Sequence, residues 1–128
     1  MPIRFNHLEP RLHTADFRRS VAFYRDVLGF TIEAMFPGEN PSFAIMSRDG
    51  LAIMLRLVPA PERISPNEKQ GGTWDAFFWV RNARTLYAEL RANGADIVYG
   101  PIVQDAYQME EFAVRDREGY VLGFGQPI

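Results

Sequence analysis

The sequence predicts an α+β fold in which two tandem βαβββ modules form curved mixed β-sheets around a cleft. Three local signals occur twice along the chain, each time about 66 residues apart. They are a residue that can cap a helix (Asp16, Asn82), a glycine that can end one (Gly29, Gly94) and a turn (residues 49–50, 116–119). A repeat with a constant period indicates one structural unit used twice, with each copy covering the apolar face of the other. Any ligand site is therefore expected in the cleft between the modules.

The size and composition indicate one globular domain spanning residues 1–128. A chain of 128 residues buries roughly two thirds of its unfolded surface, whereas each half alone would be marginal. Hydrophobic residues make up 47% of the chain and aromatic residues 13%. These proportions suit a well-filled core and argue against disorder.

Charge and cysteine content narrow the function classes. The 14 basic and 16 acidic residues form no basic run, which argues against a nucleic-acid partner. The absence of cysteine excludes disulfides, thiolate metal ligands and thiol nucleophiles. The N-terminus lacks the apolar core of a signal peptide, and no apolar stretch is long enough to span a membrane. We therefore expect a cytoplasmic protein without a membrane partner.

The first module is expected over about residues 5–57. An extended segment at 7–14 stops at Asp16, whose side chain suits the N-cap of a helix. Apolar residues recur at helical spacing over 17–28, and Gly29 ends this helix at a position that favours positive φ. A strand follows at 30–36, and Asp49-Gly50 closes a hairpin over 42–57.

A linker and a second copy of the module follow. Residues 58–72 contain three prolines and a Gly-Gly pair, which favours a linker. The second module is expected over about 73–126, with a strand at 73–80 and a helix capped by Asn82 and ended by Gly94. Gly100-Pro101 is expected to end a short strand at 97–99, and the segment 108–115 should pair with 120–125.

Side-chain alternation predicts which residues face the cleft. Glu9, Arg11 and His13 share one face of the first strand, and the repeat makes Asp75, Phe77 and Trp79 their counterparts. A two-residue turn at 49–50 pairs Ile45 with Met54. The corresponding pairing in the second hairpin gathers Glu110, Phe112, Val114, Val121 and Gly123. The candidate ligand-binding residues are Glu9, Arg11, His13, Phe43, Met54, Arg56, Asp75, Phe77, Trp79, Glu110 and Phe112.

Two sequence runs resemble the vicinal oxygen chelate superfamily, which contains glyoxalase I, extradiol dioxygenases and bleomycin resistance proteins. The run DFRRSVAFYRDVLGF at 16–30 is similar to the first-helix signature of that superfamily, and EFAVRDREGYVLGF at 111–124 is similar to its last hairpin. The resemblance covers essentially the whole chain. It implies the fold described above and a homodimer, but it is weak evidence for any one function.

The resemblance also places the metal-ligand positions of the superfamily on this chain. They fall on Glu9, Met54, Asp75 and Gly123. A thioether is a poor ligand for a hard divalent ion, and glycine has no side chain to offer. We therefore expect no metal or other cofactor, and a closer similarity to the metal-free bleomycin resistance proteins.

The leading functional hypothesis is thus a metal-independent protein that sequesters a small molecule in an aromatic-lined, charged cleft. The resemblance suggests a cationic aromatic drug, for which Glu9, Asp75 and Glu110 would supply negative charge. Arg11 and Arg56 would instead suit an anionic ligand, so the sequence leaves the charge of the ligand open.

Two alternatives remain. One is a divalent-metal-dependent lyase or dioxygenase that holds its ion with Glu9 and Asp75, with His13 and Glu110 as candidate catalytic residues. The other is a non-catalytic dimeric interaction module whose cleft is closed by aromatic side chains. Glu9 also has an ordinary structural interpretation as an ion-pair partner of Arg11 or Arg56.

Overall fold

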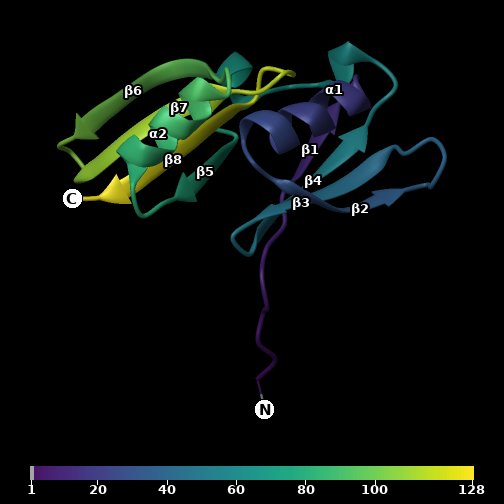
Figure 1. Cartoon of the computed structure of the whole chain (residues 1–128), viewed down its shortest axis with the longest axis horizontal. Coiled ribbons are helices and arrows are strands. Elements are labelled where there is room, and N and C mark those ends of the chain that lie inside the picture. The colour runs from purple at the N-terminus through teal and green to yellow at the C-terminus, as the bar shows by residue number, and fades with distance from the viewer. Residues whose placement is uncertain (1) are drawn as a thin grey trace.

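The computed structural model describes residues 2–128, and it contains two modules that each combine a four-stranded sheet with a helix (Figure 1). The first contains β1 (Arg11–Thr14), α1 (Phe17–Ala22), β2 (Thr31–Phe36), β3 (Phe43–Arg48) and β4 (Leu51–Leu57). The second contains β5 (Ala76–Trp79), α2 (Ala83–Ala92), β6 (Asp96–Gln104), β7 (Met109–Arg115) and β8 (Val121–Pro127). Two short 3-10 helices, Pro61–Arg63 and Asn67–Gln70, lie in the connection.

Both sheets have the same topology. The strand orders are β1-β4-β3-β2 and β5-β8-β7-β6, so β1 and β5 occupy equivalent edges. Each of these edge strands runs parallel to its neighbour, whereas the remaining strands are antiparallel. The predicted α+β class with two tandem modules is confirmed.

The helices begin and end at the residues that the sequence indicated. Asp16 accepts a hydrogen bond from the Arg19 amide at 3.3 Å, and Asn82 accepts one from the Thr85 amide at 3.0 Å. The first helix continues beyond α1 as a wider π-type turn over Phe23–Val27. Within residues 2–128, no helix is long and apolar enough to cross a membrane.

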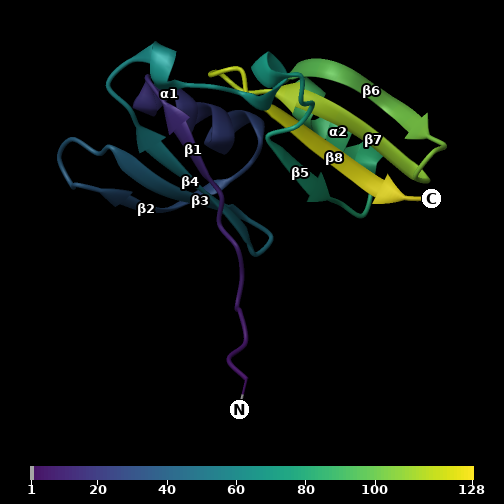
Figure 2. The same ribbon diagram turned by 180° about the vertical axis from the view of Figure 1, so that it is seen from behind.

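Both helices lie on one side of the molecule and leave the opposite faces of the sheets uncovered. In Figure 1 α1 and α2 lie in front of the strands, and in Figure 2, from behind, the strands lie in front of the helices. β1 and β5 lie nearest the middle, so the two sheets stand side by side. One apolar core fills the helix side of both modules, and it includes Leu12, Tyr24, Leu55, Leu90, Phe112 and Phe124.

Buried polar contacts connect the two modules. The Tyr24 hydroxyl donates to Asp116 at 2.7 Å, and the Thr14 hydroxyl donates to Glu118 at 2.6 Å. Burial raises the pKa of the Asp116 carboxyl, although the hydroxyl of Tyr24 and two backbone amides donate to this side chain. These contacts fix the end of β1 and the π-type turn after α1 against the turn that precedes β8.

β6 differs from the expectation that Gly100-Pro101 ends a short strand. The strand continues to Gln104, and its pairing with β7 is irregular between Tyr99 and Ile102. Gly100 adopts φ +88°, and a Cβ there would lie 2.5 Å from the Glu111 carbonyl oxygen. The Gly-Pro pair therefore causes a local irregularity in the pairing but does not end the strand.

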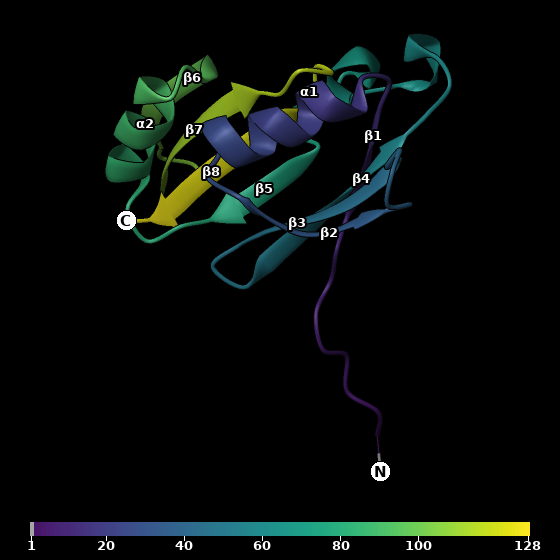
Figure 3. The same cartoon turned by 45° about the vertical axis from the view of Figure 1, so that its right-hand side comes forward.

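The N-terminal residues form an extended arm rather than the start of a strand. Strand pairing was expected from His7 but begins at Arg11, and Figure 3 shows the arm leaving the body of the protein. Its apolar side chains are almost fully exposed, at 91% for Ile3, 98% for Phe5 and 86% for Leu8. Such an arm lacks the apolar contacts that would hold it against its own chain.

Candidate ligand-binding face

The faces opposite the helices carry most of the predicted site residues, and we call them the helix-free faces. On the first sheet the pairs Phe43 with Arg56 and Ile45 with Met54 occur as the turn at 49–50 predicts. β1 adds Arg11 beside Met54 and His13 beside Arg56. The helix-free face of the first sheet therefore comprises Arg11, His13, Phe43, Ile45, Met54 and Arg56.

The second hairpin is paired differently from the prediction. Ala113 lies opposite Gly123 and Glu111 lies opposite Gly125, so β7 is shifted by one residue relative to the expected face. Because alternate side chains point to opposite faces, this shift moves every predicted β7 residue to the other side. The helix-free face of the second sheet comprises Phe77, Trp79, Glu111, Ala113, Gly123 and Gly125.

Phe112 and Glu110 are consequently corrected. Phe112 is fully buried in the core, where its ring stacks on Phe124 at a centroid distance of 5.1 Å. Glu110 lies on the helix side and forms an ion pair with Arg84 at 2.8 Å. Neither residue faces the predicted ligand site, and Glu110 loses its standing as a candidate catalytic residue.

Asp75 is also corrected, because both of its carboxylate oxygens have structural partners. One oxygen accepts from the Val121 amide and the other from the Asn67 amide, each at 2.9 Å. These bonds join the start of β5 to β8 and to the inter-module connection. Both carboxylate oxygens therefore have a structural role in joining these segments.

The metal-ligand positions implied by the resemblance do not fit a metal ion. A Cβ on Gly123 would lie 2.6 Å from Phe77 Cδ2 and 2.8 Å from Trp74 Cδ1, so aromatic rings fill the place of the missing donor. Met54 would offer only a thioether. Within residues 2–128, no group of three or more acidic or histidine side chains is arranged to hold a metal.

Glu111 is the principal residue that the sequence prediction missed. Its side chain is completely buried, and one carboxylate oxygen accepts from the Tyr107 hydroxyl at 2.6 Å and the Tyr99 hydroxyl at 3.1 Å. Tyr99 in turn accepts from the Trp74 indole at 2.9 Å. Burial and the neighbouring carboxylate raise the pKa of Tyr99 to about 12 and that of Tyr107 to about 12, so both phenols remain donors at neutral pH.

The signal that would have revealed Glu111 is the length of the last turn. Five residues, 116–120, separate Arg115 from Val121, which are the first pair of the hairpin. Counting from that pair places Glu111 opposite Gly125. Tyr99 and Tyr107 carry no such signal, because the irregularity in β6 and the loop before β7 decide where their hydroxyls lie.

Glu9 precedes β1 on the face that alternation assigns to Arg11 and His13. The chain already runs along β4 here, since the Pro10 carbonyl accepts from the Met54 amide at 2.8 Å. One Glu9 oxygen contacts the His7 ring, while the other is buried without a hydrogen-bond partner in residues 2–128. The free Glu111 oxygen is the second such atom in this part of the chain.

Phe77 and Trp79 present aromatic surface on the same face. Phe77 packs against Trp74 at a centroid distance of 4.7 Å and approaches Trp79 edge-on at 6.1 Å. Trp79 is 67% exposed, which is unusual for so large an apolar side chain. The aromatic surface next to the buried Glu111 is therefore accessible from solvent at Trp79.

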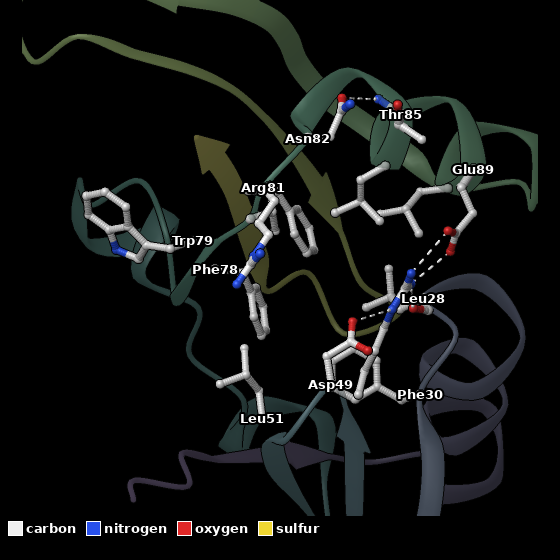
Figure 4. A pocket seen from close by; sticks show the side chains of 15 residues that line it. Leu28, Phe30, Asp49, Leu51, Phe78, Trp79, Arg81, Asn82, Thr85 and Glu89 are labelled. Carbon is white, nitrogen blue, oxygen red and sulfur yellow. Dashed lines mark hydrogen bonds and ion pairs between the residues drawn. The ribbon is translucent and has the colours of Figure 1, made fainter. Parts of the chain in front are cut away.

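A cavity of about 620 Å³ also lies between the modules, on the helix side. Of the predicted site residues it includes only Trp79, whose ring points away from the cavity in Figure 4. The sequence predicted a ligand site between the modules and a set of residues to line it. In the structure the cavity between the modules and most of those residues lie on opposite sides of the sheets.

Comparison with known proteins gives one family. The family model described as the glyoxalase/bleomycin resistance protein/dioxygenase superfamily matches residues 4–124. No curated protein matches the chain in sequence.

Solved structures show the same fold at low sequence identity. TioX from Micromonospora sp. ML1 is 24% identical with a TM-score of 0.76, and the match covers 96% of this chain and all of TioX. UcmS2 is 21% identical with a TM-score of 0.75, covering 96% of this chain and 98% of UcmS2. TnmS3 from Streptomyces sp. CB03234, described as an antibiotic binding protein, is 20% identical with a TM-score of 0.74, covering 99% of this chain and all of TnmS3.

Proposed function

Because the chain belongs to the glyoxalase/bleomycin resistance protein/dioxygenase superfamily, we propose that it is a metal-independent binding protein for a flat, cationic small molecule. The ligand lies on the helix-free faces and donates hydrogen bonds to Glu9 and Glu111. TnmS3, which shares the fold, is described as an antibiotic binding protein, and the proposal extends that kind of activity to this chain.

The observation that carries the proposal is the pair of buried, unpartnered carboxylate oxygens. One belongs to Glu9, which precedes β1, and the other to Glu111 on β7. No other side-chain oxygen or nitrogen in residues 2–128 is buried without a partner. Leaving a buried acceptor unpaired costs about 1–3 kcal/mol, and more for a charged group. A ligand that donates a protonated amine to these oxygens recovers that free energy on binding.

The burial of the charged side chains favours a cationic ligand over an anionic one. Arg11 and Arg56 are exposed, so water already solvates their guanidinium groups. Glu111 is fully buried, and only neutral phenols donate to it. Within residues 2–128, the buried charge that lacks a partner on the helix-free faces is therefore negative, and it favours a cationic ligand although exposed arginines are also present.

The aromatic residues suit a planar ligand. Trp79 is exposed, and its edge contact with Phe77 leaves a ring face open to a stacking partner. A cation over a tryptophan face gains about 0.5–2 kcal/mol, depending on how well it is desolvated. Stacking on Trp79 would place the charged end of a ligand toward Glu111 on the same face.

We further propose that the functional unit is a homodimer. The two helix-free faces stand side by side in one chain (Figure 2), so a second copy is needed to enclose a ligand between two such faces. The exposed arm residues Ile3, Phe5 and Leu8 supply apolar surface that a partner can cover. Sedimentation velocity should give the mass of a dimer, and removal of residues 2–8 should shift it toward the monomer.

The binding proposal is tested with proflavine, a planar fluorescent cation. We expect saturable binding to the wild-type protein that is unchanged by EDTA. Glu111→Gln keeps the shape of the side chain but removes its charge, and it should weaken proflavine binding at least about tenfold, because hydrogen bonds to charged groups contribute about 1.5–3 kcal/mol. Glu39→Gln is the matched control, since Glu39 is an exposed carboxylate in the turn before β3.

Two outcomes would contradict the proposal. One is equal weakening of proflavine binding by both substitutions, which would indicate a general charge effect. The other is a stoichiometric divalent ion whose removal lowers the melting temperature, because a ligand selective for the folded state stabilises that state.

A further inference from the structure

The cavity between the modules is separate from the helix-free faces. Its walls come from both modules, and the sheet residues Phe78 and Phe124 contribute the face opposite to that of Phe77 and Gly123. The cavity is lined by Leu28, Phe30, Arg48, Asp49, Leu51, Phe78, Trp79, Val80, Arg81, Asn82, Thr85, Leu86, Glu89, Leu90 and Phe124. Of the residues assigned to the proflavine-type ligand, only Trp79 also borders this cavity, and its ring points away from it (Figure 4).

The floor of the cavity is apolar and its size suits a small molecule. Leu28, Phe30, Leu90 and Phe124 are core residues that are each at most 5% exposed. The volume of about 620 Å³ lies within the roughly 300–1,000 Å³ typical of small-molecule sites. Leu51, which is 51% exposed at the rim, extends this apolar surface toward solvent.

The charged groups on one wall of the cavity form ion pairs with one another, whereas the arginine on the other wall has no ion-pair partner within residues 2–128. Arg48 donates two hydrogen bonds to Glu89, at 2.8 and 3.1 Å, and a third to the Leu28 carbonyl. Asp49 lies 3.6 Å from Arg48 and its side chain is 89% exposed. Their charges are thus compensated by one another or by water.

Arg81 is the cation without a partner. It follows the end of β5 and is exposed, and no carboxylate in residues 2–128 lies within 4.0 Å of it. Unlike the exposed Arg11 and Arg56, it borders an apolar cavity in which the hydrophobic body of a ligand can pack. Figure 4 shows its side chain beside Phe78 and across the cavity from Glu89, which is the carboxylate paired with Arg48. A guanidinium beside an apolar wall suits a carboxylate or sulfonate carried on a hydrophobic body.

We infer that the inter-module cavity is a second binding site, which takes an amphipathic organic anion. The apolar body of the ligand lies on Leu28, Phe30 and Phe78, and its carboxylate or sulfonate pairs with Arg81. The ligand contacts both modules at once, so its binding stabilises their packing. Its charge is opposite to that of the ligand on the helix-free faces, so the two sites are distinguishable by probe.

The probes are anilinonaphthalene sulfonate, which fluoresces in apolar sites, and decanoate as its competitor. We expect one saturable sulfonate site per chain from which decanoate displaces the fluorophore. Arg81→Gln should weaken decanoate binding about two- to fivefold, as expected for an exposed ion pair, and leave decanol, the uncharged analogue, unaffected. Arg63→Gln is the matched control, because Arg63 is an exposed arginine in the connection between the modules.

Two further variants test the apolar part of the site. Leu86→Trp places a bulky indole ring in the cavity and should abolish binding of both probes. Leu51→Glu adds a negative charge at an exposed rim position, where it does not threaten folding, and should weaken the anions more than decanol. Melting temperatures verify that each variant is folded.

The inference is overturned if Arg81→Gln and Arg63→Gln weaken decanoate equally, or if folded Leu51→Glu binds the sulfonate as the wild type does. Failure of the proflavine experiment would leave this result untouched, because Glu111 takes no part in the cavity.

Discussion

The substitution Gly123→Ala tests whether aromatic rings fill the position that the family resemblance assigns to a metal ligand. The new Cβ would lie 2.6 Å from Phe77 Cδ2 and 2.8 Å from Trp74 Nε1. Both rings must retreat by roughly 1 Å to reach ordinary contact distance. Such overpacking typically costs about 1–3 kcal/mol.

Part of that cost is offset by the stabilising effect of replacing glycine with alanine, and a second glycine provides a control that measures this effect alone. Replacing glycine by alanine stabilises the protein by about 0.4–1 kcal/mol where space and backbone permit, because the unfolded chain loses freedom. A Cβ added at Gly38 would have no atom within 4 Å, and Gly38 has no positive φ, so Gly38→Ala should show this gain alone. We therefore expect Gly123→Ala to lower the free energy of unfolding by about 1–2 kcal/mol relative to the wild type.

Urea denaturation followed by tryptophan fluorescence measures both the free energy and its structural origin. The protein has two tryptophans, and Trp79 is largely exposed, so a change in the native emission reports mainly on Trp74. Displacement of Trp74 should also weaken its hydrogen bond to Tyr99. Adding Phe77→Leu to Gly123→Ala should recover at least about 1 kcal/mol of the loss, since contacting residues couple. Stability within about 0.5 kcal/mol of the wild type, with unchanged emission, would refute the reasoning.

Three other outcomes follow from the same structure. Tyr99 and Tyr107, whose pKa values are raised to about 12, should ionise well above pH 10 in an absorbance titration; their contribution to stability is complete below about pH 10 and is lost as the pH rises through 12. Burial raises the pKa of Asp116. The contribution of this group to the free energy of unfolding is therefore present below about pH 4 and is lost as the pH rises through the pKa of the folded state. Asp116→Asn should remove this part of the pH dependence of unfolding. Phe112→Ala should cost about 3–5 kcal/mol in urea denaturation, as a core position does, and leave the proflavine affinity of the folded fraction unchanged.

The sequence determined the fold because the signals for it are local and occur twice. The N-caps at Asp16 and Asn82 and the turn at Asp49-Gly50 each depend on residues within a few positions of one another. Their repetition was enough to define two modules and their order. The two-residue turn also set the register of the first hairpin, and with it the shared face of Phe43, Met54 and Arg56.

Only the tertiary structure determines which charged side chains lack a hydrogen-bond or ion-pair partner. Both proposed sites depend on such side chains. In the sequence Asp75 is a candidate ligand carboxylate, whereas in the structure amides from β8 and from the connection donate to both of its oxygens. Glu111 lies on the helix-free face because the register of β7 with β8 places it opposite Gly125. Arg81 borders a cavity because two modules that are distant in sequence pack together there. Alternation fixes the face of a side chain only once the register is known, and burial and pairing depend on atoms contributed by remote parts of the chain.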